Sequence, residues 1–207
     1  MYGGRISIVV GGAVGGISTI LGLAIGLVAG YYRKVDAVIM RFMDGLMAFP
    51  SLILALALIA VLGASVQNVI IVITIVSVPL VARVVRASVL SLREQQFIDA
   101  AKALGVPDWR ILMLHIAPNT LAVLMVQGTF VFALAVIAEA NLSFLGAGVP
   151  PTTPSWGNIM GEGRTYLSLA FWVTFFPGVF LSLTVLAINL LGDGLRDALD
   201  PKLRRRA

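Results

Sequence analysis

Cysteine is absent from the 207-residue chain, and histidine occurs only once, as His115. These absences exclude a disulfide framework, a cysteine metal or redox site and a histidine-rich metal site. Charged residues are scarce too, at 12% of the chain against about a quarter in a soluble domain. With 59% hydrophobic residues and a mean hydropathy of +0.99, the chain carries more apolar surface than a soluble globule of this size can bury. We therefore expect a membrane protein.

The net charge of +5 could indicate a nucleic-acid partner, but that function needs a basic stripe with interleaved aromatic residues. The 15 lysines and arginines instead lie in short gaps between long apolar runs. We therefore expect no nucleic-acid partner.

Five apolar runs approach the roughly 20 helical residues that are needed to cross a bilayer core. They lack the alternation of barrel strands, so they predict an all-α, polytopic membrane helix bundle of five transmembrane helices, in which residues 1–207 form one transmembrane domain. The third run is short, but its helix can continue past Arg83 and Arg86 if these side chains reach the interface. The runs cover about residues 6–30, 46–63, 69–82, 121–138 and 167–191.

The glycines of the first run lack the preceding strand and the following Lys-Ser/Thr of a nucleotide-binding loop. Gly22, Gly26 and Gly30 fall on one helical face, which is typical of close helix packing in lipid. We expect no catalytic residue, no metal and no cofactor in this chain.

The positive charges predict the topology. If residues 31–45, residues 83–118 and the tail after residue 191 share one side, that side holds 13 of the 15 lysines and arginines. Only Arg5 and Arg164 remain on the other side. The positive-inside rule then places the first side in the cytoplasm, with the N-terminus outside and the C-terminus inside.

Two connections are long: the cytoplasmic loop 83–118 and the external loop 141–166. In the first, Phe97, Ala101 and Leu104 share a face of a predicted helix, which Gly105 ends. Pro107 suits the start of a second short helix. Because this loop has no nucleophile beside a base, we interpret it as a docking surface.

The cytoplasmic loop resembles the EAA loop of binding-protein-dependent ABC importer permeases. The matching residues are Asp99, Ala100 and Ala101, followed by Gly105 and Pro118. The chain has Asp99 where the family has glutamate, and Ala117 where leucine precedes the proline. The resemblance implies that 83–118 is an EAA-type coupling loop that contacts an ATPase.

Further segments resemble the dipeptide, oligopeptide and nickel branch, and within it the C-type permease subunit. They are YGGRIS at 2–7, MAFPS at 47–51, LSFLG at 142–146, PSWG at 154–157 and GDGLRDALDP at 192–201. The resemblance implies the type I ABC importer permease fold in a bacterial or archaeal plasma membrane, which is the inner membrane in Gram-negative cells. It also implies a B-type permease, two ATPase subunits, a solute-binding protein and membrane lipid as partners. Family members usually have a further helix before the Tyr-Gly segment, so five spans here suggest an internal start or a fragment.

Glu139 is the ionisable residue that lies at the outer end of the fourth run, where a carboxylate is costly unless it is paired or hydrated. Two interpretations are open: a contact to the transport path or the binding protein, or a structural role as an interface anchor or as a hydrogen-bond partner for the adjoining loop. Trp156, Tyr166 and Trp172 are interpreted as an outer aromatic belt.

Two other functions remain as alternatives. An ion-coupled secondary transporter would need ionisable groups near the midplane, and the five runs are nearly free of them. A non-transporting membrane scaffold is the other. The residues do not identify the solute that is transported.

Overall fold

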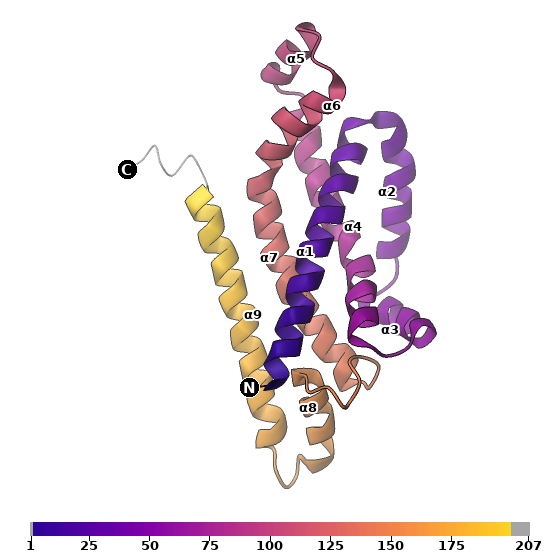
Figure 1. Cartoon of the computed structure of the whole chain (residues 1–207), viewed down its shortest axis with the longest axis vertical. Helices are drawn as coiled ribbons and strands as arrows, with labels where there is room; N and C mark the ends of the chain where they lie inside the picture. The colour runs from indigo at the N-terminus through magenta and orange to yellow at the C-terminus, as the bar shows by residue number, and fades with distance from the viewer. Residues whose placement is uncertain (1, 200–207) are drawn as a thin grey trace.

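The computed structural model describes residues 2–199 as an elongated bundle of helices, without a strand in that range (Figure 1). The basic residues Lys202, Arg204, Arg205 and Arg206, which entered the topology count, lie outside the described residues. In chain order the elements are α1 (Tyr2–Tyr31), α2 (Arg33–Met47), α3 (Ser51–Leu62), α4 (Val66–Leu92), α5 (Gln96–Ala103), α6 (Asp108–Arg110), the π-helix η1 (Ile111–Ile116), α7 (Ala117–Phe144), α8 (Trp156–Gly163), the 3₁₀ turn η2 (Arg164–Tyr166) and α9 (Trp172–Leu199).

Four helical stretches in the described part of the chain are long and apolar enough to cross a membrane. They are α1, α4, the continuous stretch Asp108–Phe144 that contains α7, and Trp172–Asp197 within α9. A fifth crossing results when α2 and α3 are counted as one bent span. The predicted all-α membrane bundle is therefore confirmed. The two ends of the bundle are called here the α5 end and the α8 end (Figure 1).

The second predicted span, residues 46–63, is not one continuous helix. The structure has α2 and α3 there, bent by 89° at residues 48–50, which we call the elbow. Pro50 explains the break, because proline has no backbone N–H to donate and disfavours helical geometry at the residue before it. Residues 31–45, expected as a connection, form most of α2. The outer loop likewise contains a helix, α8, rather than only irregular chain.

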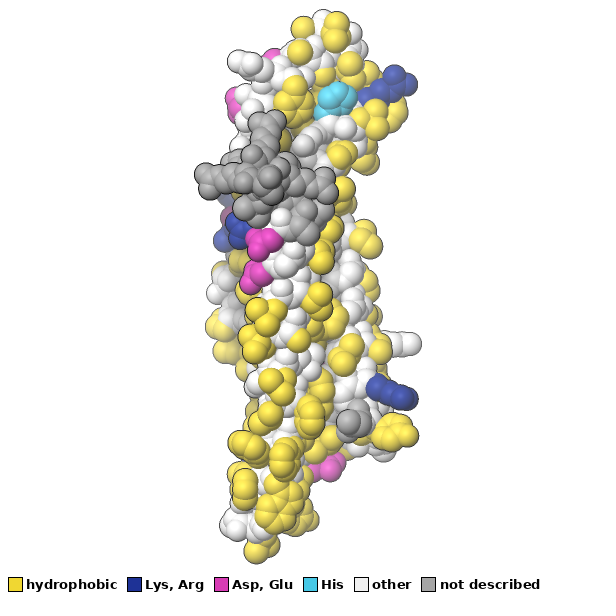
Figure 2. All heavy atoms as spheres, turned by 90° about the vertical axis from the view of Figure 1, so that its left-hand side faces the viewer, with side chains coloured by type: hydrophobic (Ala, Val, Ile, Leu, Met, Phe, Trp, Pro, Cys, Tyr) yellow, Lys and Arg dark blue, Asp and Glu magenta, His cyan; other side chains and the backbone are white. Residues whose placement is uncertain are grey.

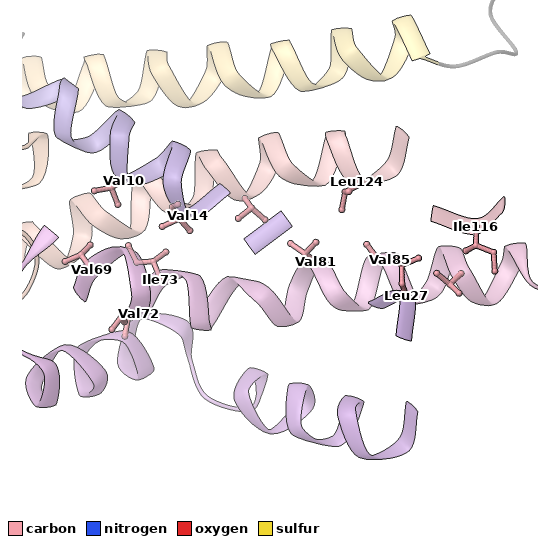
Figure 3. Packing of buried hydrophobic residues seen from close by; sticks show 14 of the residues in the cluster. Val10, Val14, Leu27, Val69, Val72, Ile73, Val81, Val85, Ile116 and Leu124 are labelled. Carbon is pink, nitrogen blue, oxygen red and sulfur yellow. The ribbon is translucent and has the colours of Figure 1, made fainter. Parts of the chain in front are cut away.

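The core is the contact between α1 and α4. An ideal Cβ on Gly22, Gly26 or Gly30 would lie 2.5–2.6 Å from the Cβ of Val81, Val85 or Val89, respectively, so only glycine permits this approach. The face predicted from the glycine spacing is thus the packing face. Figure 3 shows Val81 and Val85 in the cluster of buried residues that also contains Leu27 of α1. Nearer the N-terminus of α1, Gly11 packs against Val136 and Phe132 of α7.

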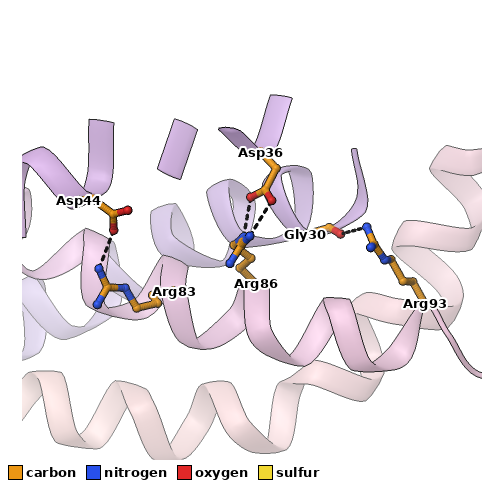
Figure 4. A network of polar contacts seen from close by, with 6 residues as sticks. All are labelled: Gly30, Asp36, Asp44, Arg83, Arg86 and Arg93. Carbon is orange, nitrogen blue, oxygen red and sulfur yellow. Dashed lines mark hydrogen bonds and ion pairs between the residues drawn. The ribbon is translucent and has the colours of Figure 1, made fainter. Parts of the chain in front are cut away.

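Ion pairs connect α2 to α4 (Figure 4). Arg86 donates from Nε and Nη2 to the two carboxylate oxygens of Asp36, with 2.6 Å between Nη2 and Oδ2. Arg83 Nη2 lies 2.6 Å from Asp44 Oδ1. The sequence predicted that this helix can continue past both arginines, and α4 does extend to Leu92. The charges of both arginines are paired with α2.

We predict that Gly26→Ala destabilises the protein, because the new methyl would overlap Val85 Cβ at 2.6 Å and the Ala82 carbonyl oxygen at 2.7 Å. Overpacking of this kind costs about 1–3 kcal/mol, and thermal unfolding in detergent would measure it. Gly16→Ala is the matched control on the same helix, since nothing lies within 4 Å of its added Cβ. Equal unfolding temperatures for the two variants would contradict the α1–α4 packing.

Candidate functional site

Residues 93–116, which we call the knob, join α4 to α7 and project beyond the other helices at the α5 end (Figure 1). The knob contains Asp99, Ala100 and Ala101 on α5, but these three residues do not share one environment. Asp99 and Ala100 are exposed, whereas Ala101 is buried together with Ile98. Ala101 therefore holds α5 against the chain, and Asp99 and Ala100 face outward.

The apolar face predicted for this helix is only partly right. Phe97 and Leu104 were expected beside Ala101, but Phe97 is 43% exposed and Leu104 is 83% exposed. Ile98 takes the buried position instead. Leu104 therefore lies on the outer surface of the knob.

Gly105 ends α5 with a Schellman motif. Its φ of +75° is in the left-handed region, which favours glycine. The Gly105 N–H donates to the Lys102 carbonyl at 2.9 Å, and the Val106 N–H donates to the Ala101 carbonyl at 3.1 Å. The predicted glycine stop is confirmed, and it gives the knob a defined rather than a frayed end.

The second half of the knob runs directly into α7. Pro107 caps α6 as predicted, and η1 then places Ile111 and Ile116 fully inside the core while Trp109 stays 59% exposed. Pro118 lies in the first turn of α7, where a missing N–H is tolerated. The knob is thus continuous with a membrane helix on both sides, α4 before it and α7 after it.

Two hydrogen bonds tie the knob to the end of α1. Tyr31 Oη donates to Asp108 Oδ1 at 2.7 Å, and Arg93 Nη1 donates to the Gly30 carbonyl at 3.0 Å. Sequence reasoning did not find these contacts, since they join residues 77 and 63 positions apart. Through them, the knob is attached to α1 as well as to α4 and α7.

Glu139 lies far from the knob, near the α8 end of α7, and is fully buried. Its carboxylate accepts hydrogen bonds from Ser7 Oγ of α1 at 2.6 Å and from Ser143 Oγ at 2.7 Å. Ser143 Oγ in turn accepts from the Val149 N–H at 3.1 Å. Of the two interpretations left open, this geometry is that of a hydrogen-bond partner that joins α1, α7 and the adjoining loop.

The loop beside Glu139 is well ordered by its own contacts. Asn158 Nδ2 donates to the carbonyl oxygens of Val149, Pro150 and Thr153 at 2.9–3.2 Å. Trp156 was predicted to lie in an aromatic belt, but it is only 8% exposed and packs on Gly4 of α1, so that prediction is wrong for this residue. Tyr166 and Trp172 are half exposed, as a belt requires. Within residues 2–199, no cluster of three histidine, aspartate or glutamate side chains could hold a metal ion.

The fold and the knob define a multi-pass helical membrane protein. The family described as binding-protein-dependent transport system inner membrane component matches residues 19–205. The chain belongs to this family. Membership makes it a membrane component of a transport system, which decides against the ion-coupled secondary transporter and the non-transporting scaffold.

Curated relatives extend the similarity over almost the whole chain. The chain is 50% identical to a putative peptide transport system permease protein of Brucella suis, over 99% of this chain and 69% of that protein. It is 47% identical to the dipeptide transport system permease protein DppC of Alkalihalophilus pseudofirmus, over 99% and 67%. It is 42% identical to the glutathione transport system permease protein GsiD of Pectobacterium atrosepticum, over 99% and 68%.

Solved structures support the fold. A chain of the inward-facing MetNI methionine ABC transporter superposes with a TM-score of 0.80 at 20% identity, covering 96% of this chain and 94% of that one. The predicted type I ABC importer permease fold is confirmed.

We predict that Glu139→Gln lowers stability by about 1–3 kcal/mol, because the amide offers one acceptor oxygen where the carboxylate serves two serine hydroxyls. Unfolding temperature and proteolysis of the loop after α7 would report the change. Glu162→Gln, at an exposed position of α8, is the matched control and should have little effect. An unchanged stability of Glu139→Gln would show that the network does not hold the loop.

Proposed function

We propose that the chain is one of two permease subunits of an ATP-driven importer and forms half of its translocation path. The second half would come from a B-type permease, and the knob would dock on an ATPase, of which the transporter would have two. The observation that carries this proposal is the knob itself. It is a capped helix outside the bundle that exposes Ala100 and Leu104 while Ile98 and Ala101 fasten it to the chain.

The knob would couple ATPase movement to the membrane helices. An ATPase that contacts Asp99, Ala100 and Leu104 differently in its two nucleotide states shifts the equilibrium between two permease conformations. Because the knob is continuous with α4 and α7 and tied to α1 at Tyr31, these three helices would move together with it.

The proposed orientation places the α5 end in the cytoplasm, with the N-terminus of α1 outside and the C-terminus of the chain inside. The distribution of lysine and arginine supports it. Arg33, Lys34, Arg93 and Arg110 all lie near the α5 end, whereas Arg5 and Arg164 lie at or near the α8 end. The α8 end would then face an external solute-binding protein.

We propose peptides or a related small solute as the cargo. The printed names of the relatives support this class, since they describe peptide, dipeptide and glutathione transport. The ATPase subunits, rather than this chain, would carry ATP hydrolysis.

We predict that Ala100→Arg and Leu104→Arg abolish ATPase docking without unfolding the permease. Both side chains are exposed, so arginine fits the isolated chain but places an unpaired charge in a closely packed interface. Recovery of the ATPase with the tagged permease should fall about tenfold or more, which corresponds to at least about 1.4 kcal/mol.

Val35→Arg is the matched control, because Val35 is an exposed aliphatic residue near the same end of the bundle but outside the knob. It should leave ATPase recovery unchanged. Ala101→Arg is unsuitable as a docking test, since Ala101 is buried and its replacement would displace α5. Full ATPase recovery and ATP-dependent uptake in both knob variants would contradict the proposed docking site.

A further inference from the structure

The elbow between α2 and α3 lies beside a groove of about 510 Å³. The groove is formed by α2, α3, α4 and α7, and its wall includes Met47, Pro50, Ser51, Ser77, Leu134 and Asn141. Ser77 lies 11 residues after the first residue of α4, about 16 Å along the helix axis. The elbow and the groove are therefore at membrane depth, away from both ends of the bundle (Figure 1).

The backbone of the elbow is incompatible with lipid. α3 begins at Ser51 without a side-chain cap, and its first internal bond at this end joins Leu54 N to the Pro50 carbonyl. The N–H groups of Ser51, Leu52 and Ile53 precede that bond and have no partner within the helix. Ala48, Phe49 and Pro50 are all exposed. Irregular backbone is tolerated at this depth only against protein or water.

The ion pair between Asp44 and Arg83, on the same side of the bundle as the elbow, also indicates a surface that lipid does not cover. Asp44 precedes the groove residue Met47 by three positions, and its side chain is 58% exposed although it pairs with Arg83. The Arg83 side chain is 49% exposed. Charges at this depth face the interior of an assembly or a water-filled cavity and not hydrocarbon.

The face formed by α9, on the other side of the bundle from the elbow, has the properties of a surface that contacts lipid. α9 has no ionisable residue from Trp172 to Gly192, its helix continues through Pro177, and none of its most apolar window is buried. Figure 2 shows hydrophobic side chains along most of this face. Ser182 is exposed at mid-helix, but its hydroxyl donates to the Gly178 carbonyl at 2.9 Å, which satisfies it without water.

We infer that the elbow and its groove form this chain's wall of the translocation path, and that their occupants are water and the solute in transit. The inference rests on the proposed function and names the surface that carries it. Among the described residues that line the groove none is ionisable, and Ser51, Ser77 and Asn141 supply its polar side chains. The rest of the wall is apolar, so the groove can contact the apolar side chains of a peptide and hydrogen-bond its amide groups at these three positions. It holds no fixed charge, so that the solute can leave again.

Cysteine labelling in the assembled transporter tests this inference, and the natural absence of cysteine makes the parent chain a clean background. Ser51→Cys and Ser77→Cys are compared with Ser182→Cys, the same substitution on the face assigned to lipid. Each variant is first checked for ATP-dependent uptake. A charged, membrane-impermeant methanethiosulfonate is then applied to inside-out and right-side-out vesicles, with and without ATP, and modification of this subunit is followed by mass spectrometry.

The thiols at positions 51 and 77 should react about tenfold or more faster than the thiol at position 182, because the charged reagent enters water and not hydrocarbon. If either variant does not assemble, Asn141→Cys replaces it. Equal rates at positions 51, 77 and 182, or no reaction at 51 and 77 in either nucleotide state while uptake persists, would overturn the inference. Failure of the parent complex to bind an ATPase would instead contradict the proposed function.

Discussion

Helices in a membrane gain little by burying apolar surface against each other, since the lipid is equally apolar, so their association depends on close packing. In this protein α1 and α4 pack closely where Gly22, Gly26 and Gly30 of α1 face the valines of α4. That contact continues to the last turn of α1. There Gly30 accepts a hydrogen bond from Arg93, and Tyr31 next to it donates to Asp108. The position of the knob thus follows from how closely α1 and α4 approach.

The second constraint is that backbone polar groups need partners wherever lipid surrounds the chain. α1 and α7 meet it as long continuous helices, and α4 and α9 do so except where Pro79 and Pro177 each lack one backbone donor. The pair α2 and α3 does not, because Pro50 interrupts it at membrane depth. The interruption therefore identifies a face that other protein or water must cover, and it distinguishes that face from α9. A permease needs both kinds of surface, one toward its lipid and one toward the path.

Local patterns in the sequence predicted those features of the fold that depend on residues close together in the chain. The apolar runs predicted the long helices, the spacing of Gly22, Gly26 and Gly30 predicted a packing face, and Gly105 predicted the end of α5. Hydropathy failed at residues 46–63, since an average over the run does not register that one proline removes a backbone donor. The aromatic-belt interpretation was wrong for Trp156, whose large ring is buried against α1, where Gly4 leaves room for it.

Contacts between distant residues could not be predicted from one sequence. Arg86 and Asp36 are 50 positions apart, and Glu139 and Ser7 are 132 positions apart. Nothing in the local pattern pairs them, because the pairing depends on the rotation of each helix about its axis. The same is true of the outward direction of Ala100 and the inward direction of Ala101, which only the packing of α5 decides.

The central claim is that the knob and the helices α1, α4 and α7 move as one body. The most direct test is the distance between spin labels at Lys102→Cys on α5 and Ile20→Cys, an exposed position of α1, measured by pulsed electron paramagnetic resonance in an assembled transporter that retains uptake. If the knob and these helices move as one body, the distance stays the same, to within about 2 Å, without nucleotide and with ATP trapped. A change of about 5 Å, the rise of one helical turn, would show that the knob moves relative to the bundle and would contradict the account.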